Sequence, residues 1–218
     1  MNRRSLWEQI VQQLEMRHAE LGMAVLQHIK LVAVSMGIAI VIGVTLGIAV
    51  SRFRRLEGPV IGTAGMLQTI PSLALLGFMI PLFGIGELPS IIALFLYSLL
   101  PIIRNTHTGI VSVDKSVIEA ASGMGMTDTQ ILFRIQLPIA FPVIMAGVRT
   151  STVINVGTAT LAAFIGAGGL GDFIFLGISR SMDALVLIGA VPAALLALLL
   201  DFVLGRLERA VTPKGLKI

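Results

Sequence analysis

The sequence predicts an all-α integral membrane protein with five transmembrane helices and an N-terminal amphipathic helix. Of its 218 residues, 56% are hydrophobic and 13% are charged, and the mean hydropathy is +0.94. Soluble domains average about 25% charged residues. The apolar residues also fall into five runs long enough to cross a bilayer core of about 30 Å. The predicted spans are residues 31–50, 59–82, 89–110, 139–165 and 183–204.

Composition also excludes several classes of function. The chain contains no cysteine, which rules out disulfides and Cys-based metal sites. Its net charge of +4 does not indicate nucleic-acid binding, because the basic residues cluster beside apolar runs. We therefore expect membrane lipid around this chain and no nucleic acid.

The N-terminal segment, residues 1–30, is predicted to be an amphipathic helix lying on the membrane surface, apart from a transmembrane domain of residues 31–218. Its apolar residues recur at helical spacing, and Trp7 suits an interfacial anchor. We favour a plain leader helix that has no function beyond anchoring the chain. The apolar residues are Leu6, Ile10, Leu14, Leu21 and Val25.

The first span, residues 31–50, contains no charged residue. Small side chains occur along it at every fourth position, which places them on one helical face. Such a face allows a second helix to approach closely. The predicted packing seam consists of Ser35, Ala39, Gly43, Gly47 and Ser51.

The second span, residues 59–82, is predicted to be continuous but bent at Pro71. Gln68, Thr69 and Ser72 surround this proline. A polar, bent segment at membrane depth is acceptable where it lines a cavity or is covered by neighbouring helices. These residues are candidates for a translocation path, with a kink used only for packing as the alternative.

The third and fourth spans carry the remaining polar candidates. Tyr97 lies in the third span, and Ser151, Asn155 and Thr158 share one face of the fourth. Polar groups at this depth are functional candidates by default. A buried network that fastens helices is the alternative for Asn155, and Arg149 is expected either to line the path or to tie this span to the polar region that precedes it.

That polar region, about residues 114–138, lies between the third and fourth spans and is predicted to be a helix, a bend and a second helix. Gly123 and Gly125 suit the bend, Thr127 or Asp128 suits the second N-cap, and Pro138 is expected to stop the second helix. A helix pair of this kind at the membrane surface suits a socket on another protein.

This region resembles the EAA loop of bacterial ABC importer permeases. The motif is Glu-Ala-Ala, three residues, Gly, nine residues, Ile, one residue, Leu-Pro, and every spacing is met. The matching residues are Glu119, Ala120, Ala121, Gly125, Ile135, Leu137 and Pro138. The resemblance implies that these residues couple the chain to a separate ATPase by docking in a groove on it.

Longer stretches are similar to permeases of osmoprotectant importers, which carry glycine betaine, carnitine, choline or proline betaine. They are residues 68–86, 93–110 and 156–178. This resemblance implies a MetI-like permease that works by alternating access with two ATPase subunits, a second permease copy or paralogue, and an external binding protein. It also implies a bacterial cell membrane location, with ATP and Mg on the ATPase, no cofactor on this chain and no catalytic or metal site.

The expected topology has five spans, with an external N-terminus and a cytoplasmic C-terminus. Arg52, Arg54 and Arg55 mark one cytoplasmic turn. Residues 166–183 are expected to be a glycine-rich external loop, and the histidines are expected to be interfacial. The C-terminal basic residues are Arg206, Arg209, Lys214 and Lys217.

Other functions remain as alternatives. The same type of permease could carry another small solute, such as an amino acid or taurine, or the chain could be an ATP-independent carrier. Gly166, Gly168 and Gly171 spell GxGxxG, but a dinucleotide site needs a preceding strand, and here a predicted membrane helix precedes the motif. The sequence also lacks the P-loop pattern GxxxxGK[ST], so any ATP-driven transport requires an ATPase on another chain.

Overall fold

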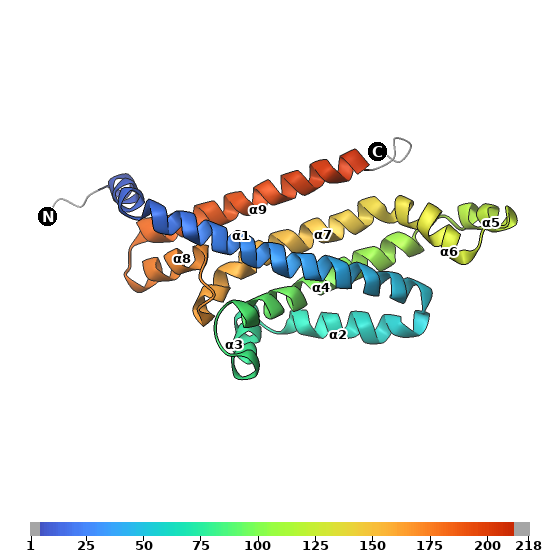
Figure 1. Ribbon diagram of the computed structural model, residues 1–218, viewed down its shortest axis with the longest axis horizontal. Coiled ribbons are helices and arrows are strands. Elements are labelled where there is room, and N and C mark those ends of the chain that lie inside the picture. Colours follow the sequence, from blue (N-terminus) through green and yellow to red (C-terminus); the bar gives the residue numbers. More distant parts are fainter. Residues whose placement is uncertain (1–4, 212–218) are drawn as a thin grey trace.

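The computed structural model describes residues 5–211, and within that range every regular element is helical. The α-helices, three short 3₁₀ or π segments aside, form an elongated bundle (Figure 1). Their bounds are α1 Leu6–Arg52, α2 Glu57–Thr69, α3 Ser72–Phe83, α4 Glu87–Val111, α5 Lys115–Gly123, α6 Asp128–Ile131, α7 Leu137–Ala159, α8 Leu170–Ser179 and α9 Asp183–Val211.

Side-chain contacts establish the relative direction of α1 and α4. At one end of the bundle Lys30 of α1 pairs with Glu87 of α4 at 2.6 Å. Further along, Gly47 of α1 faces Thr106 of α4, so these two helices are parallel. Between them the chain returns through α2 and α3, and it later returns through α7. With α9 this makes five crossings, of which four are single long apolar helical stretches and the fifth is the bent pair α2–α3.

The first helix is continuous across the predicted boundary at residue 30. One helix of 47 residues, α1, runs from the amphipathic segment through the first span, and only Arg17 departs from helical geometry (φ −126°, ψ 17°). A straight helix of this length would measure about 70 Å, over twice the thickness of a bilayer core. The amphipathic segment that lies apart from the span is therefore Leu6–Met16, which turns away from the rest of α1 (Figure 1).

The second span is broken rather than bent. Helices α2 and α3 meet at an angle of 101°, because Ile70 is extended (φ −70°, ψ 128°) as residues before proline tend to be. Tyr97 of α4 covers the break, since its hydroxyl donates to the Ile70 carbonyl at 2.6 Å. Gln68 Nε2 donates in turn to the Tyr97 carbonyl at 2.9 Å. The predicted continuous helix over residues 59–82 is thus wrong at its centre.

The packing seam on the first span is confirmed. A Cβ on Gly43 would lie 2.8 Å from Ile102, and one on Gly47 would lie 2.5 Å from the Cβ of Thr106. The absence of these side chains lets α1 and α4 approach closely enough for backbone and side-chain contact. The central apolar core then forms where α1, α4 and α7 meet, with Leu31, Leu76, Leu94 and Ile102 fully buried.

The predicted external loop of residues 166–183 contains a helix, α8. The glycines before it pack on α1: Gly168 and Gly169 have φ of +76° and +89°, and the Gly169 amide donates to Gln27 Oε1 at 3.2 Å. His28, next to Gln27, is fully buried and its Nε2 lies 3.1 Å from the Val156 carbonyl. The expectation that this histidine is interfacial is therefore wrong. Of the GxGxxG glycines, Gly168 packs on Gln27 and Gly171 packs on the Thr160 carbonyl and Ala163.

Candidate functional site

The loop between α4 and α7 forms the predicted helix–bend–helix. Its first helix, α5, begins at the N-cap Asp114, whose Oδ1 accepts from the Ser116 amide at 2.8 Å. This hydrogen bond lowers the pKa of the exposed Asp114 carboxyl, because the ionised carboxylate accepts it more strongly than the protonated acid does. The cap fixes where α5 starts on leaving α4.

The bend is a Schellman motif, in which a left-handed residue ends a helix and two hydrogen bonds close behind it. Met126 N–H donates to the Ala121 carbonyl at 3.2 Å, and Gly125 N–H donates to the Ser122 carbonyl at 2.9 Å. Gly125 has φ +81°, which favours glycine, whereas Gly123 is still helical. The motif requires the left-handed residue to come four positions after Ala121, and this explains the spacing of the EAA pattern physically.

The second arm starts at Thr127, as predicted. Its hydroxyl accepts from the Gln130 amide, and the Gln130 side chain accepts from the Thr127 amide at 2.9 Å, a complete capping box. Asp128, in the first turn, lies 3.6 Å from Arg52 at the end of α1. The two caps and the bend fix the angle between the arms.

The expectation that Pro138 stops the second helix is wrong. The chain continues from α6 through a π-helical turn, Leu132–Gln136, into α7 without leaving helical geometry. Pro138 follows this π turn directly, and the wider turn lies where the proline ring would otherwise meet the carbonyl of the preceding turn. Ile135, Leu137 and Pro138 are half-buried in this continuous stretch, so the second arm is rigidly joined to the fourth span.

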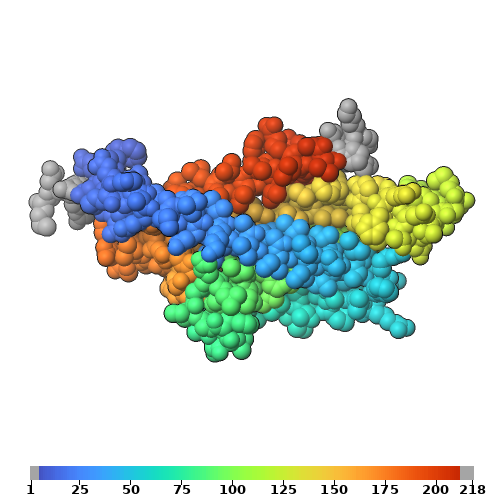
Figure 2. Space-filling model, viewed as in Figure 1, coloured from blue at the N-terminus to red at the C-terminus, as the bar shows by residue number. Residues whose placement is uncertain are grey.

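The surface of the loop is both charged and apolar, and it projects from one end of the molecule (Figure 2). Glu119 and Ala120 are exposed, while Ala121 is buried behind them. Two large apolar side chains stand on the same loop, Met124 with 75% and Phe133 with 60% of its surface exposed. Exposed apolar side chains rimmed by polar ones are typical of protein interaction sites.

The predicted path residues fall into two groups, and the first group is buried. Asn155 is 1% exposed and joins three helices. Its Oδ1 accepts from Ser35 of α1 at 3.1 Å, and its Nδ2 donates to Ser98 of α4 at 2.7 Å. Ser151 donates to the Ser98 carbonyl at 2.6 Å. This geometry favours the alternative in which Asn155 and Ser151 fasten helices together.

Replacing Asn155 with Leu is expected to lower the free energy of unfolding by about 1–2 kcal/mol, because it removes the hydrogen bonds that join α7 to α1 and α4. Thr158→Val is the matched control, since Thr158 is half-buried and donates only to Ile154 in its own helix at 2.9 Å. Thermal unfolding of the detergent-solubilised protein measures both. Equal melting temperatures for the two variants would contradict the fastening role.

The second group lies at the break between α2 and α3. Gln68 and Tyr97 hold the break closed, as described above, and Thr69 is exposed with its hydroxyl donating to the Met66 carbonyl at 2.7 Å. Ser72 is half-buried at the start of α3. The structure thus joins Gln68, Tyr97 and the α2–α3 break, whereas Asn155 makes its hydrogen bonds to other residues, Ser35 and Ser98.

Arg149 has partners that the sequence analysis missed. Its Nε and Nη2 donate to the two Asp201 oxygens at 2.9 and 3.1 Å, and its Nη1 donates to Glu208 at 3.0 Å. These contacts tie α7 to α9, so the expected tie to the polar loop is wrong. The available signal was one arginine and one aspartate isolated in two apolar spans, which at that depth are expected to pair.

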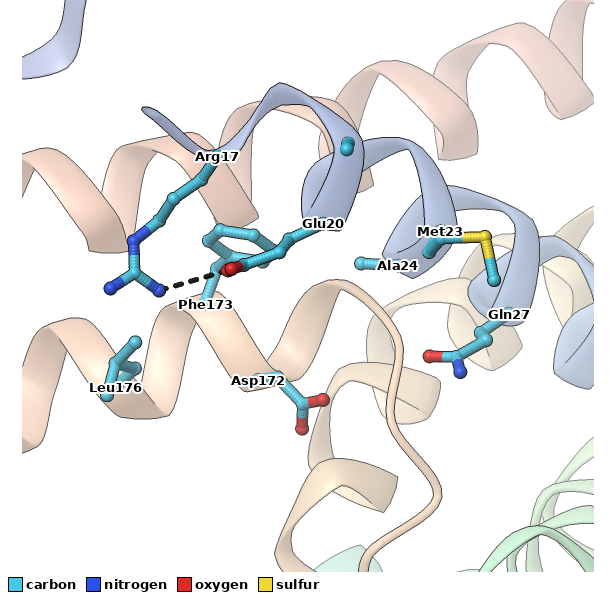
Figure 3. Close-up of a pocket in the computed structure, with 9 residues that line it drawn as sticks. Arg17, Glu20, Met23, Ala24, Gln27, Asp172, Phe173 and Leu176 are labelled. Atoms are coloured by element: carbon cyan, nitrogen blue, oxygen red, sulfur yellow. Dashed lines mark hydrogen bonds and ion pairs between the residues drawn. The ribbon is translucent and has the colours of Figure 1, made fainter. Parts of the chain in front are cut away.

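An open groove of about 500 Å³ lies at the opposite end of the bundle, between α1 and α8. Figure 3 shows Arg17 pairing with Glu20 on α1, at 3.1 Å, while Asp172 on α8 points away from that pair. The described residues contain no group of three potential metal ligands of the His, Cys, Asp or Glu type. The groove therefore presents mixed charges that do not converge on one point.

Comparison with known proteins agrees with this geometry. Residues 39–213 match the family described as "binding-protein-dependent transport system inner membrane component". A chain from a solved structure titled "Inward facing conformations of the MetNI methionine ABC transporter" is 26% identical with a TM-score of 0.78, over 88% of this chain and 96% of that one.

Curated relatives are similar over most of their length. The glycine betaine/carnitine/choline transport system permease protein OpuCB of Bacillus subtilis is 50% identical over 87% of both chains. The choline transport system permease protein OpuBB of the same organism is 45% identical over 95% of this chain and 96% of its own. The osmoprotectant import permease protein OsmW of Salmonella typhimurium is 50% identical over 88% of this chain and 91% of its own.

Proposed function

This chain belongs to the family of binding-protein-dependent transport system inner membrane components, and from that premise we propose that it is the permease subunit of an ATP-driven importer for osmoprotectants of the betaine type. The MetI-like fold and the similarity to the osmoprotectant permeases support this proposal. The observation that carries the mechanism is the projecting loop, in which the EAA residues lie on two helical arms fixed by caps and by the bend at Gly125.

The loop is proposed to dock on one of two ATPase subunits, which bind ATP and Mg. Met124 and Phe133 supply apolar contacts, and Glu119 supplies a charged one. Because the second arm continues through the π turn into α7, closure of the ATPase pair would rotate or shift α7 directly. We propose that this movement of α7 switches the permease between its inward-open and outward-open states. Ala120, Ala121, Ile135, Leu137 and Pro138 would determine the shape of the two helical arms that transmit it.

The translocation path is proposed to lie between this chain and a second permease copy or paralogue. Gln68, Thr69, Ser72 and Tyr97 surround the α2–α3 break, and Thr158 adds a hydroxyl on α7; Ser151 and Asn155 support that wall from behind. Weak binding of the solute along this path is consistent with the positions of two aromatic residues. Trp7 lies on the segment Leu6–Met16 and is 72% exposed, and the Tyr97 hydroxyl is already hydrogen-bonded at the break. High-affinity selection would then belong to an external binding protein.

The orientation in the bacterial cell membrane follows from the same proposal. The loop must meet a cytoplasmic ATPase, so the end of the bundle that carries α5, Arg52 and the last turn of α9 is proposed to be cytoplasmic. The end that carries Lys30, Glu87 and α8 is then external, and the N-terminal segment lies outside. Trp7 and its apolar neighbours on Leu6–Met16 would then lie in the lipid–water interface on the external side of the cell membrane.

Uptake into proteoliposomes that hold the permease, ATPase and binding protein tests the proposal. Labelled glycine betaine, carnitine and choline are each expected to accumulate at least about tenfold more with ATP on the ATPase side than with a non-hydrolysable analogue, since pumping requires hydrolysis. Uptake that does not depend on ATP would contradict the assignment of the chain to an ATP-driven importer. ATP-dependent uptake of methionine or taurine instead would support ATP-driven import but contradict the osmoprotectant assignment.

A further inference from the structure

The cytoplasmic half of α9 is held in an unusual way. The buried residues of α9 lie in its external half, from Ala184 to Ala193, with one exception, Gly205. In that external half Leu185 and Ile188 pack with Leu170 and Phe173 of α8. Beyond residue 193, long apolar side chains face outward, among them Leu198, which is 67% exposed.

Grooves flank this half of α9 on two sides. One, of about 510 Å³, separates it from α7 and is lined by Thr150, Ile154 and Leu198 among others. The other, of about 430 Å³, separates it from α1 and is lined mainly by apolar residues, including Met36, Val148 and Leu200. Packing against the core in this region is limited to half-buried side chains such as Leu196, Leu200 and Leu204.

Arg149 bridges α7 and α9 and lines the first of these grooves together with Asp201. It makes a two-point contact with Asp201 and a third hydrogen bond with Glu208, two turns further along α9. Gly205 makes this reach possible, because a Cβ there would lie 3.2 Å from the guanidinium carbon. The guanidinium, the carboxylates and the glycine form one unit, which we name the α7–α9 clasp: Arg149, Asp201, Gly205 and Glu208.

We infer that the α7–α9 clasp is a positioning device for transport: it makes the cytoplasmic half of α9 move with α7 when the coupling loop moves. The inference rests on the proposed function, since it needs an ATPase to drive α7. A two-point arginine–carboxylate contact fixes orientation as well as distance. The loosely packed flanks supply little other constraint, so without the clasp α7 would move and α9 would lag behind it.

The test compares solute molecules transported per ATP hydrolysed in the reconstituted complex. Arg149→Met is expected to lower this ratio about tenfold, since residues that transmit coupling typically change it by this order, while ATPase binding is retained because the loop is intact. Asp201→Asn is expected to lower it less. The exchange of charges, Arg149→Asp with Asp201→Arg, is expected to recover part of the ratio, which a purely steric role would not produce.

Arg104→Met is the matched control, because Arg104 is an exposed arginine of α4 outside the clasp. An unchanged ratio of solute transported to ATP hydrolysed in Arg149→Met would overturn the positioning role of the α7–α9 clasp. An equal loss in Arg104→Met would overturn it as well. If Arg149→Met fails to fold, the same ratio measured in Asp201→Asn and in the charge-exchange variant tests the positioning role, and an unchanged ratio in Asp201→Asn would overturn it. Absence of ATP-driven uptake in the wild-type complex would instead overturn the proposed function.

Discussion

Gly125→Val is expected to reduce ATP-driven uptake to about a tenth of the wild-type rate or less. Valine at φ +81° costs about 1–3 kcal/mol, and relaxing that strain breaks the two hydrogen bonds that close the bend behind Ala121 and Ser122. The second arm would then leave at another angle. Uptake and co-purification of the ATPase, measured side by side, show whether docking or force transmission is lost.

Gly123→Ala is the control for this variant. A Cβ added to either glycine would meet nothing within 4 Å, but Gly123 is helical and accepts alanine without strain. Gly125→Asn is expected to fall between Val and Gly, because asparagine tolerates the left-handed conformation better than most residues. Uptake by Gly125→Val equal to that of Gly123→Ala would contradict the role of the bend.

Gly147→Val is expected to lower the free energy of unfolding by about 3 kcal/mol and to disturb the packing of α7 on α4. A Cβ at this position would lie 2.7 Å from the Pro101 carbonyl oxygen and 2.6 Å from the Cβ of Asn105. Neither atom is at the end of a flexible side chain, so the helices must separate. Thermal unfolding in detergent measures the effect on stability.

Gly37→Val provides the comparison, since Gly37 is exposed on α1 and a Cβ there meets nothing within 4 Å. Its melting temperature is expected to stay close to that of the wild type, because surface substitutions usually change stability by less than about 0.5 kcal/mol. Gly147→Ala already places the clashing Cβ and is expected to lose most of the stability lost in Gly147→Val. A tolerated Gly147→Ala would contradict close α4–α7 contact.

The fold could be predicted from the sequence wherever local composition determines it. The lengths of the apolar runs predicted the membrane spans. Small residues at every fourth position from Ser35 to Gly47 predicted the packing seam between α1 and α4. The bend and second cap of the loop between α4 and α7 followed from Gly125 and Thr127. These features depend on residues close together in the chain, and the family resemblance added the fold and the partner class.

What the sequence could not show depends on contacts between distant segments. The break at Ile70 exists because Tyr97 can satisfy it from α4, and the sequence of the second span alone allows a simple kink as well. The partner of Arg149, Asp201, is 52 residues away, so no local pattern shows the pair, and only a comparison of the polar residues in two separate spans could have suggested it. His28 is buried between the glycine loop before α8 and Val156 of α7, both distant from it in the sequence.

The predicted path residues show the same limit. Polar character marked Ser151 and Asn155, but polarity at membrane depth serves either a wet cavity or a helix junction, and only the positions of Ser35 and Ser98 distinguish the two. The prediction for Pro138 is wrong for a related reason. A π turn, which no local pattern announces, allows the helix to continue past it.

The break between α2 and α3 also bears on how the chain is built during synthesis. Helix α2 has 13 residues, about 20 Å, which is too short to cross a bilayer core alone. The groups that complete the break, the hydroxyl and carbonyl of Tyr97, follow Gln68 by 29 residues. Helices α2 and α3 therefore cannot make these final contacts until α4 has been synthesised.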